Sequence, residues 1–89
     1  MKITKKNGTI MLYDDEKVIR SILRANGEVE WEVISEKEAA VIANEVFDRV
    51  TKLGGLISTA DVRSGVYAVL LEKGYPETAQ HYMQFKKQD

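Results

Sequence analysis

The strongest constraint on the fold is a long amphipathic segment that runs from Ser35 to Leu53. Ser35 is followed three residues later by Glu38, the spacing of a capping box at the start of a helix. Apolar residues then recur at helical spacing until Gly54-Gly55 ends the pattern, namely Ala39, Ile42, Ala43, Val46, Val50 and Leu53. The pattern predicts one long helix with a single apolar stripe.

Three further segments predict shorter helices. The first begins at the N-cap Asp14, carries Val18, Ile19, Ile22 and Leu23 on one face, and ends at Asn26-Gly27 in a left-handed stop. The second begins at Ser58 or Thr59, turns Val62, Val66, Val69 and Leu70 inward, and stops at Gly74. The last has Pro76 in its first turn and carries Ala79, Tyr82, Met83 and Phe85 or Lys86.

The N-terminus predicts a β-hairpin. Two short runs, 2–6 and 9–13, are joined by Asn7-Gly8, the dipeptide best suited to a two-residue type I′ turn. This register pairs Lys6 with Thr9, Lys5 with Ile10, Thr4 with Met11 and Ile3 with Leu12. Lys5 would then share a face with three apolar residues, Ile3, Ile10 and Leu12.

Residues 28–33 predict a third strand. Acidic and apolar residues alternate strictly here, with Val29, Trp31 and Val33 on one face, as in a half-buried strand. The chain as a whole therefore predicts an α+β fold, a four-helix bundle capped by a small sheet that starts with the N-terminal hairpin. Because 89 residues cannot supply two cores, we expect one domain over residues 1–89.

Composition excludes several classes of function. Thirteen basic residues against fourteen acidic ones give a net charge of −1, too balanced for a general nucleic-acid binder. There are no cysteines, and the lone His81 cannot build a metal site or a catalytic triad. The chain shows no membrane span and no signal peptide, so the cytoplasm is the expected compartment.

Three lysines near the hairpin and the first helix start are the candidate binding residues. Lys5 on an apolar face needs either an anion or a route to water along its stem. Lys17 is the third residue of its helix, where the helix dipole disfavours a cation unless the neighbouring carboxylates offset it. Lys5, Lys6 and Lys17 could converge on a polyphosphate, although no Gly-rich phosphate loop is present.

The order of these pieces resembles the ATP-cone family. Residues 3–8, Ile-Thr-Lys-Lys-Asn-Gly, match an opening that reads apolar-x-Lys-Arg-Asp-Gly, and Tyr13-Asp14 and Lys17-Val18 follow as an aromatic-polar pair and a Lys-Ile pair. Residues 22–25 look like the end of the family's first helix, and 57–62 like the segment before its third helix. Residues 79–86 look like its terminal Ala-x-x-Tyr-x-x-Tyr/Phe-Arg signature. The tract 28–34 matches no part of the family pattern.

The resemblance implies a function and a set of site residues. ATP-cones bind ATP or dATP and regulate ribonucleotide reductases or their operons, usually by changing the oligomeric state. By motif position Lys5 and Lys6 would contact phosphates below a lid shaped by Asn7 and Gly8. Lys17 and Arg63 would also contact phosphates, Asp14 and Thr59 would lie near base or ribose, and Ile3 opens the motif.

Two departures from the family bear on the nucleotide. Lys6 replaces an arginine and loses its bidentate fork, and Met11 stands where some reductases carry an acidic residue. An apolar residue at that position is more usual in anaerobic reductases. Both departures bear on affinity and on the choice between ATP and dATP.

Three classes of function remain in competition. The leading hypothesis is a regulatory, non-enzymatic module that binds ATP or dATP, with Mg²⁺ as a candidate companion ion, a reductase as partner and a homo-oligomer as the assembly. The alternative is a helical protein-interaction domain that keeps the fold and has lost the ligand. A helix-turn-helix DNA binder fits poorly, because residues 76–85 carry no Lys or Arg.

Overall fold

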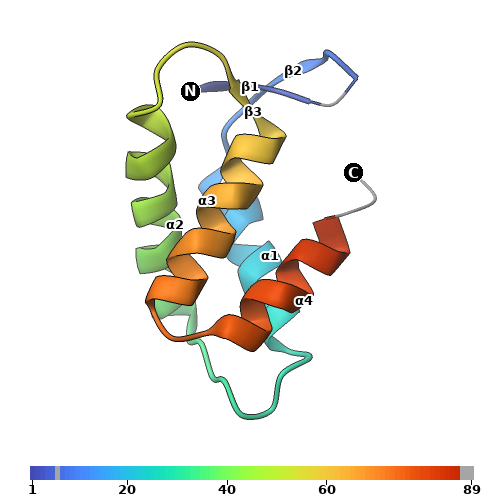
Figure 1. The fold of residues 1–89 in the computed structure, drawn as a ribbon, viewed down its shortest axis with the longest axis vertical. Helices are drawn as coiled ribbons and strands as arrows, with labels where there is room; N and C mark the ends of the chain where they lie inside the picture. Colours follow the sequence, from blue (N-terminus) through green and yellow to red (C-terminus); the bar gives the residue numbers. More distant parts are fainter. Residues whose placement is uncertain (6, 87–89) are drawn as a thin grey trace.

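Four helices and a small sheet make up residues 1–5 and 7–86, the part of the chain that the computed structural model describes (Figure 1). The helices are α1 (Asp15–Asn26), α2 (Glu36–Thr51), α3 (Thr59–Glu72) and α4 (Pro76–Lys86). The strands are β1 (Lys2–Thr4), β2 (Ile10–Leu12) and β3 (Ile57–Ser58). The sheet lies at one end of the helices, which confirms the predicted α+β class.

The predicted helix starts are confirmed by their caps. The Asp14 carboxylate accepts a hydrogen bond from Glu16 N at 3.0 Å, and Ser35 Oγ accepts one from Glu38 N at 3.1 Å. Ser58 and Asp61 form a full capping box at the start of α3. These side chains satisfy backbone N–H groups that have no partner inside the helix.

One predicted helix end has a different geometry. Gly27 follows α1 as expected, but its φ of −61° is right-handed, so the predicted left-handed stop is wrong. The chain instead continues in a turn, with Gly27 N–H donating to Leu23 O. Leu53, predicted as part of the α2 stripe, lies beyond the end of α2 and is exposed.

The core lies between the four helices and the inner face of the sheet. Its most deeply buried side chains are Ile22, Ile42, Val46, Val50, Val66, Val69, Leu70 and Thr78. Helices α2 and α3 pack tightly at Gly65, where a Cβ atom would lie 3.3 Å from Val46 Cγ1 and 3.4 Å from Val50 Cγ1. The missing side chain therefore lets the two helices pack with their backbones close together.

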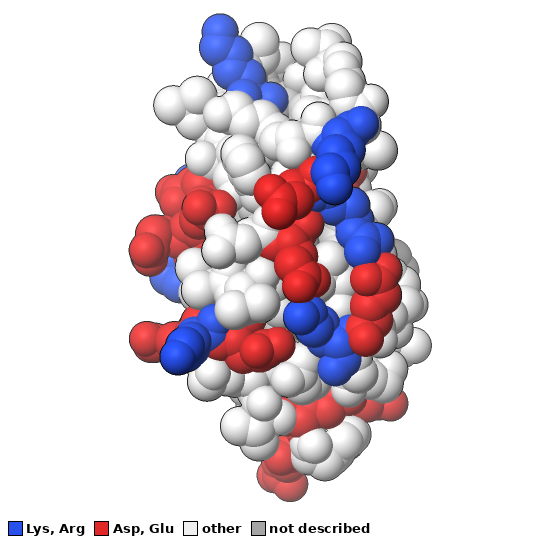
Figure 2. Space-filling view, turned by 90° about the vertical axis from the view of Figure 1, so that its left-hand side faces the viewer, with Lys and Arg blue, Asp and Glu red and all other residues white. Residues whose placement is uncertain are grey.

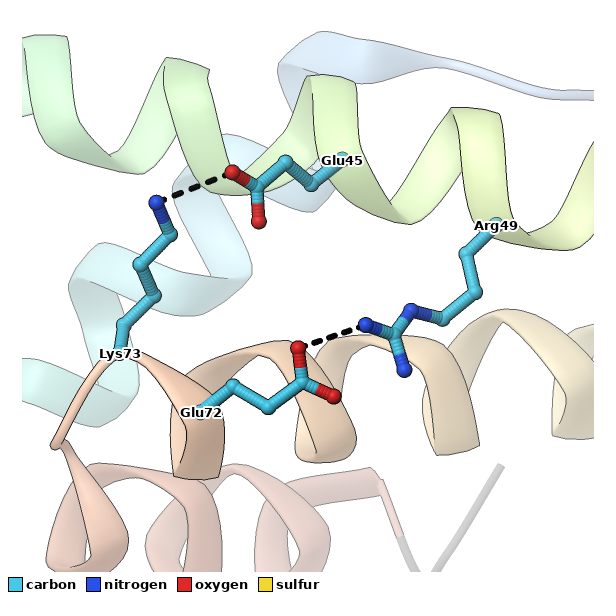
Figure 3. A network of polar contacts seen from close by, with 4 residues as sticks. All are labelled: Glu45, Arg49, Glu72 and Lys73. Carbon is cyan, nitrogen blue, oxygen red and sulfur yellow. Dashed lines mark hydrogen bonds and ion pairs between the residues drawn. The ribbon is translucent and has the colours of Figure 1, made fainter.

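Two ion pairs join the exposed sides of the same helices. Arg49 Nη2 lies 2.7 Å from Glu72 Oε1, and Lys73 Nζ lies 2.9 Å from Glu45 Oε1 (Figure 3). The hydrogen bond to Glu45 raises the pKa of Lys73. Exposed pairs of this kind contribute little to stability, so these two add little to the packing of α2 against α3.

The sheet has the strand order β2-β1-β3, with β2 antiparallel and β3 parallel to β1. Its third strand is therefore residues 57–58. The pairs Lys2 with Leu12, Ile3 with Met11 and Thr4 with Ile10 show that the predicted register is wrong by one residue.

The hairpin loop explains this shift. Lys5 N–H donates to Thr9 O at 2.7 Å and Gly8 N–H to Lys5 O at 2.9 Å, which leaves three residues in the loop. Gly8 has a φ of +88° but Asn7 does not have a positive φ, so the type I′ turn is also wrong. The extra residue places Ile3 and Met11 on the inner face and leaves Ile10 and Leu12 exposed.

Residues 27–35 form a loop between α1 and α2, so the strand predicted over 28–33 is wrong. The buried side chains are Val29, Glu32 and Ile34, whereas Trp31 and Val33 are 71% and 81% exposed. The alternating pattern placed Glu32 on the exposed face and Trp31 and Val33 on the buried face, and the structure reverses these positions. We call residues 27–35 the Trp31 loop.

The buried Glu32 carboxylate caps helix α4. Its two oxygens accept hydrogen bonds from Glu77 N at 3.1 Å and Thr78 N at 2.8 Å. Pro76, the first residue of the helix, has no N–H. Burial alone would raise the pKa of the Glu32 carboxyl, but the hydrogen bonds from Thr78 and Glu77 outweigh this effect and hold the pKa below 4.5.

Asn26 fixes the same loop from the end of α1. Its Nδ2 donates to Glu32 O at 2.6 Å and to Thr78 Oγ1 at 3.0 Å, and its Oδ1 accepts from Ile34 N at 2.9 Å. The loop is therefore held to both α1 and α4 by polar contacts.

Replacement of Glu32 by alanine should destabilise the domain. The change removes the acceptors of the part-buried Glu77 N–H and the buried Thr78 N–H, and a buried group left unsatisfied costs about 1–3 kcal/mol. Urea unfolding at pH 7 measures the loss. Glu30→Ala, at an exposed glutamate of the same loop, is the matched control, and an equal loss in both variants would contradict the capping role.

The Glu32 contribution should also depend on pH. Because folding lowers the pKa of this carboxyl, its stabilisation is present above pH 4.5 and disappears as the pH falls through the folded-state pKa. The stability difference between the wild type and Glu32→Gln should therefore narrow below pH 4.5. A constant difference across urea titrations from pH 7 to pH 3 would show that charge has no part in the cap.

Candidate functional site

A pocket of about 610 Å³ lies between the inner face of the hairpin and helices α1, α3 and α4. Its volume is within the range of small-molecule sites, about 300–1,000 Å³. The lining residues are Ile3, Lys5, Asn7, Met11, Tyr13, Asp14, Lys17, Val18, Ser21, Thr59, Val62, Arg63 and Tyr82. They come from separate parts of the chain, so only the folded domain forms the pocket.

The parallel pairing of β1 and β3 builds one wall. Thr4 pairs with Ser58, and the next residue on each strand is a pocket residue, Lys5 after β1 and Thr59 after β3. Parallel strands end at the same edge of a sheet, so the hairpin lysine lies beside the first turn of α3. Arg63, one helical turn after Thr59, lines the same wall.

The start of helix α1 builds another part of the pocket wall. Asp14 is the N-cap, and Lys17 is the third residue of the helix, as the sequence predicts. Ser21 follows Lys17 by one helical turn and donates from Oγ to Lys17 O at 2.8 Å. The N-terminal ends of α1 and α3 thus both lie at the pocket, and each carries a partial positive charge.

Among the described residues, three basic side chains line this pocket. Lys5 and Lys17 are exposed to solvent, and Arg63 is half-buried. A smaller neighbouring pocket of about 230 Å³ is lined in part by Lys5, Thr59 and Arg63. Basic side chains and helix N-termini together favour a ligand with several negative charges.

The other lining side chains are mainly apolar or aromatic. Ile3, Val18, Val62 and Tyr82 are buried, and Met11 is half-buried. They offer a surface for an uncharged ring or an aliphatic group beside the basic side chains.

Tyr13 is held in place by α2. Its ring centroid lies 5.4 Å from that of Phe47, with the two rings tilted at 58°, and its hydroxyl donates a long hydrogen bond of 3.5 Å to Ala43 O. Burial, with a smaller effect from Asp15, raises the pKa of Tyr13 to about 12. The phenol therefore remains neutral at physiological pH and adds no negative charge to the pocket.

The structure brings together most of the residues that the sequence analysis singled out. The predicted residues that line the pocket are Ile3, Lys5, Asn7, Asp14, Lys17, Thr59 and Arg63. Gly8 does not line it but supplies the positive φ of the loop, and Asn7 Oδ1 accepts from Thr9 N at 3.0 Å in the same loop. Lys6 lies outside the described residues.

Six lining residues had no place in the predicted site, namely Met11, Tyr13, Val18, Ser21, Val62 and Tyr82. Ser21 could have been found from the sequence, since it lies one helical turn after Lys17. Val62 and Tyr82 could not, because buried residues on helical stripes look the same whether they meet another helix or a pocket wall.

The structure offers neither a metal centre nor a membrane-spanning helix within the part of the chain that it describes. The described part of the chain brings no three His, Asp or Glu side chains together in a group that could hold a metal ion. No helix within residues 1–5 and 7–86 combines the length and the apolar composition needed to cross a bilayer.

Comparison with known proteins identifies the family. A search of curated proteins finds no match. A family model described as the ATP cone domain matches residues 1–89, the whole chain. The match covers both walls of the pocket and the hairpin above it. The chain therefore belongs to the ATP-cone family of nucleotide-binding regulatory domains.

Proposed function

We propose that this domain binds ATP or dATP in the 610 Å³ pocket and regulates a ribonucleotide reductase, or its expression, through nucleotide-dependent association. The observation that carries the proposal is the meeting of Lys5, Lys17 and Arg63 around one pocket that also has apolar walls. A nucleoside triphosphate has two parts that match these features, a polyanion for the basic side chains and an uncharged base for the apolar walls.

The phosphates belong at the wall formed by the hairpin end and the start of α3. Lys5 and Arg63 both line this wall, and Lys17 faces it from α1. Lys6 would add a further charge from the hairpin loop, which Asn7 and Gly8 shape. Each such charge-assisted contact is stronger than a neutral hydrogen bond.

The base and ribose belong beside Ile3, Val18 and Tyr82, with Asp14 and Thr59 as the polar groups within reach. Asp14 already accepts from Glu16 N, and this bond fixes the position of its carboxylate at the pocket edge. Mg²⁺, where bound, would neutralise part of the phosphate charge and would be held mainly by the phosphate oxygens.

A second candidate is a protein-interaction domain with this fold and no nucleotide. The observation that favours it is the exposure of large apolar side chains away from the pocket, such as Trp31 and Leu56. Calorimetric titration with ATP and dATP decides between the two functions. A titration without heat of binding for either nucleotide would favour the interaction domain.

ATP and dATP should raise the melting temperature more than AMP at equal concentration. The basic side chains neutralise a triphosphate, and a ligand at 100 times its Kd stabilises by about 2.7 kcal/mol. In a domain of this size each kcal/mol of added stability raises the melting temperature by about 4–8 °C. Differential scanning fluorimetry detects such a change readily. Equal stabilisation by AMP would show that the phosphates beyond the first contribute nothing.

Lys5→Met should weaken dATP binding by about 1.5–3 kcal/mol, the range for charge-assisted bonds, and leave the free protein as stable as before. Methionine keeps most of the side-chain length and removes the charge. Calorimetry gives the affinity and thermal unfolding gives the stability. Lys37→Met, at an exposed lysine in the first turn of α2, is the control. A lower melting temperature with unchanged affinity would make Lys5 a structural residue.

A further inference from the structure

Two surfaces at opposite ends of the molecule expose large apolar side chains. The first is the Trp31 loop, at the lower end in Figure 1, and the second is the outer side of the three-stranded sheet at the upper end. The molecule is 37 Å long in this direction, so the two surfaces cannot belong to one continuous patch. Neither surface contributes to the pocket between the hairpin and the helices.

The Trp31 loop presents its apolar residues in a fixed conformation. Trp31 and Val33 point outward because Val29, Glu32 and Ile34 are buried on the other side of the loop. Four hydrogen bonds, two with Asn26 and two from α4 to the Glu32 carboxylate, hold the loop to α1 and α4. A tryptophan on a preorganised loop loses little conformational freedom on binding, and tryptophan is enriched at binding hot spots.

The outer sheet face is also apolar. The register places Lys2 beside Leu12, while Leu56 immediately precedes Ile57, the partner of Ile3. Leu12 and Leu56 are 68% and 89% exposed, and Ile10 lies on the same side of β2. We call Lys2, Ile10, Leu12 and Leu56 the sheet face. Edge strand β2 contains no charged residue to discourage pairing with another chain.

The two surfaces carry opposite charge. The Trp31 loop exposes two glutamates, Glu28 and Glu30, and contains no lysine or arginine. The charged residue of the three strands is Lys2. Figure 2 shows carboxylates at the lower end, and lysine or arginine atoms among uncharged side chains at the upper end.

We propose that copies of this domain associate head to tail, with the Trp31 loop of one copy against the sheet face of the next. Trp31 and Val33 would cover Leu12 and Leu56, and the exposed Glu28 and Glu30 would face Lys2. A contact between two Trp31 loops would place Glu28 and Glu30 opposite their own copies, and a contact between two sheet faces would oppose two Lys2 side chains. Like charges across an interface disfavour both symmetric arrangements.

A contact between two different surfaces does not close on itself after two copies. Association of this kind adds further copies unless a ring forms, so the average mass should grow steadily with concentration. A stable interface covers about 800 Å² on each partner, a large share of the 5763 Å² surface of this domain. The small apolar surfaces therefore indicate reversible, concentration-dependent association.

The inference also connects association to the pocket, and this part rests on the proposed function. Strands β1 and β2 turn Ile3 and Met11 toward the pocket and Lys2, Ile10 and Leu12 toward the neighbouring copy. A nucleotide that orders the hairpin from the inside would order the sheet face on the outside. Head-to-tail association itself needs no nucleotide and is tested without one.

Sedimentation velocity over a wide range of protein concentration tests the association. The wild type should show a weight-average mass that rises with concentration. Trp31 is the single tryptophan, so its emission should shift to shorter wavelength and its quenching by acrylamide should fall over the same range. Trp31→Ala and Leu56→Asp should each weaken association about tenfold or more. A wild type that stays monomeric throughout would overturn the proposal.

Charge exchange distinguishes the head-to-tail arrangement from a symmetric one. Glu30→Lys and Lys2→Glu should each associate more weakly than the wild type when alone, because like charges then meet. Mixed together, each variant offers the other an opposite charge, and association should return. A mixture no more associated than its components would overturn the arrangement. Leu71→Asp, at an exposed leucine of α3 outside both surfaces, should behave as the wild type does.

Circular dichroism and dATP calorimetry on the same variants separate failure of this inference from failure of the proposed function. All substituted residues are exposed and outside the pocket, so the fold should match the wild type, and so should the dATP affinity at protein concentrations too low for association. Normal dATP binding with no association would overturn the head-to-tail contact and leave the proposed nucleotide site intact. Association without dATP binding supports the contact and contradicts the nucleotide site.

Discussion

The buried carboxylate of Glu32 is the interaction on which the arrangement of the last helix depends. It joins a loop between α1 and α2 to the first turn of α4, across 46 residues of sequence. A charged acceptor at the positive end of a helix is favourable, and burial makes the loss of that acceptor expensive. Because α4 also carries Tyr82 to the pocket wall, a contact far from the pocket helps to shape it.

The pocket depends in turn on the position of β1 at the centre of the sheet. This strand of three residues pairs with β2 on one side and β3 on the other, and both neighbours lead directly to pocket elements. After β2 the chain enters α1 through Tyr13 and Asp14, and after β3 it enters α3 at Thr59. A short sheet can therefore position two helix starts around one ligand.

Much of this fold could be predicted from local signals, and the errors have local causes. The caps Asp14, Ser35 and Ser58 mark helix starts because each acts within three residues of itself. The alternating tract 28–33 was misleading because the partners of Glu32 lie in a distant helix that no local pattern reveals. The hairpin register failed because one extra loop residue moves every strand residue to the other face.

The candidate site also contains residues that the sequence could predict and residues that it could not. Its basic residues could be found from motif order, and they lie around one pocket. Val62 and Tyr82 could not be distinguished from ordinary core residues, since burial has the same sequence signature against a helix and against a pocket. The roles of the lining residues toward a nucleotide remain part of the proposed function.

The close approach at Gly65 has a consequence for how the domain can move. Two helices whose backbones fit together at a glycine, with Val46 and Val50 packed against it, cannot slide past one another without losing that fit. Shear motion between α2 and α3 is therefore disfavoured, and these helices form a rigid frame. Any ligand-driven rearrangement must then be a hinge motion of the parts attached to that frame, the hairpin on one side and α4 on the other.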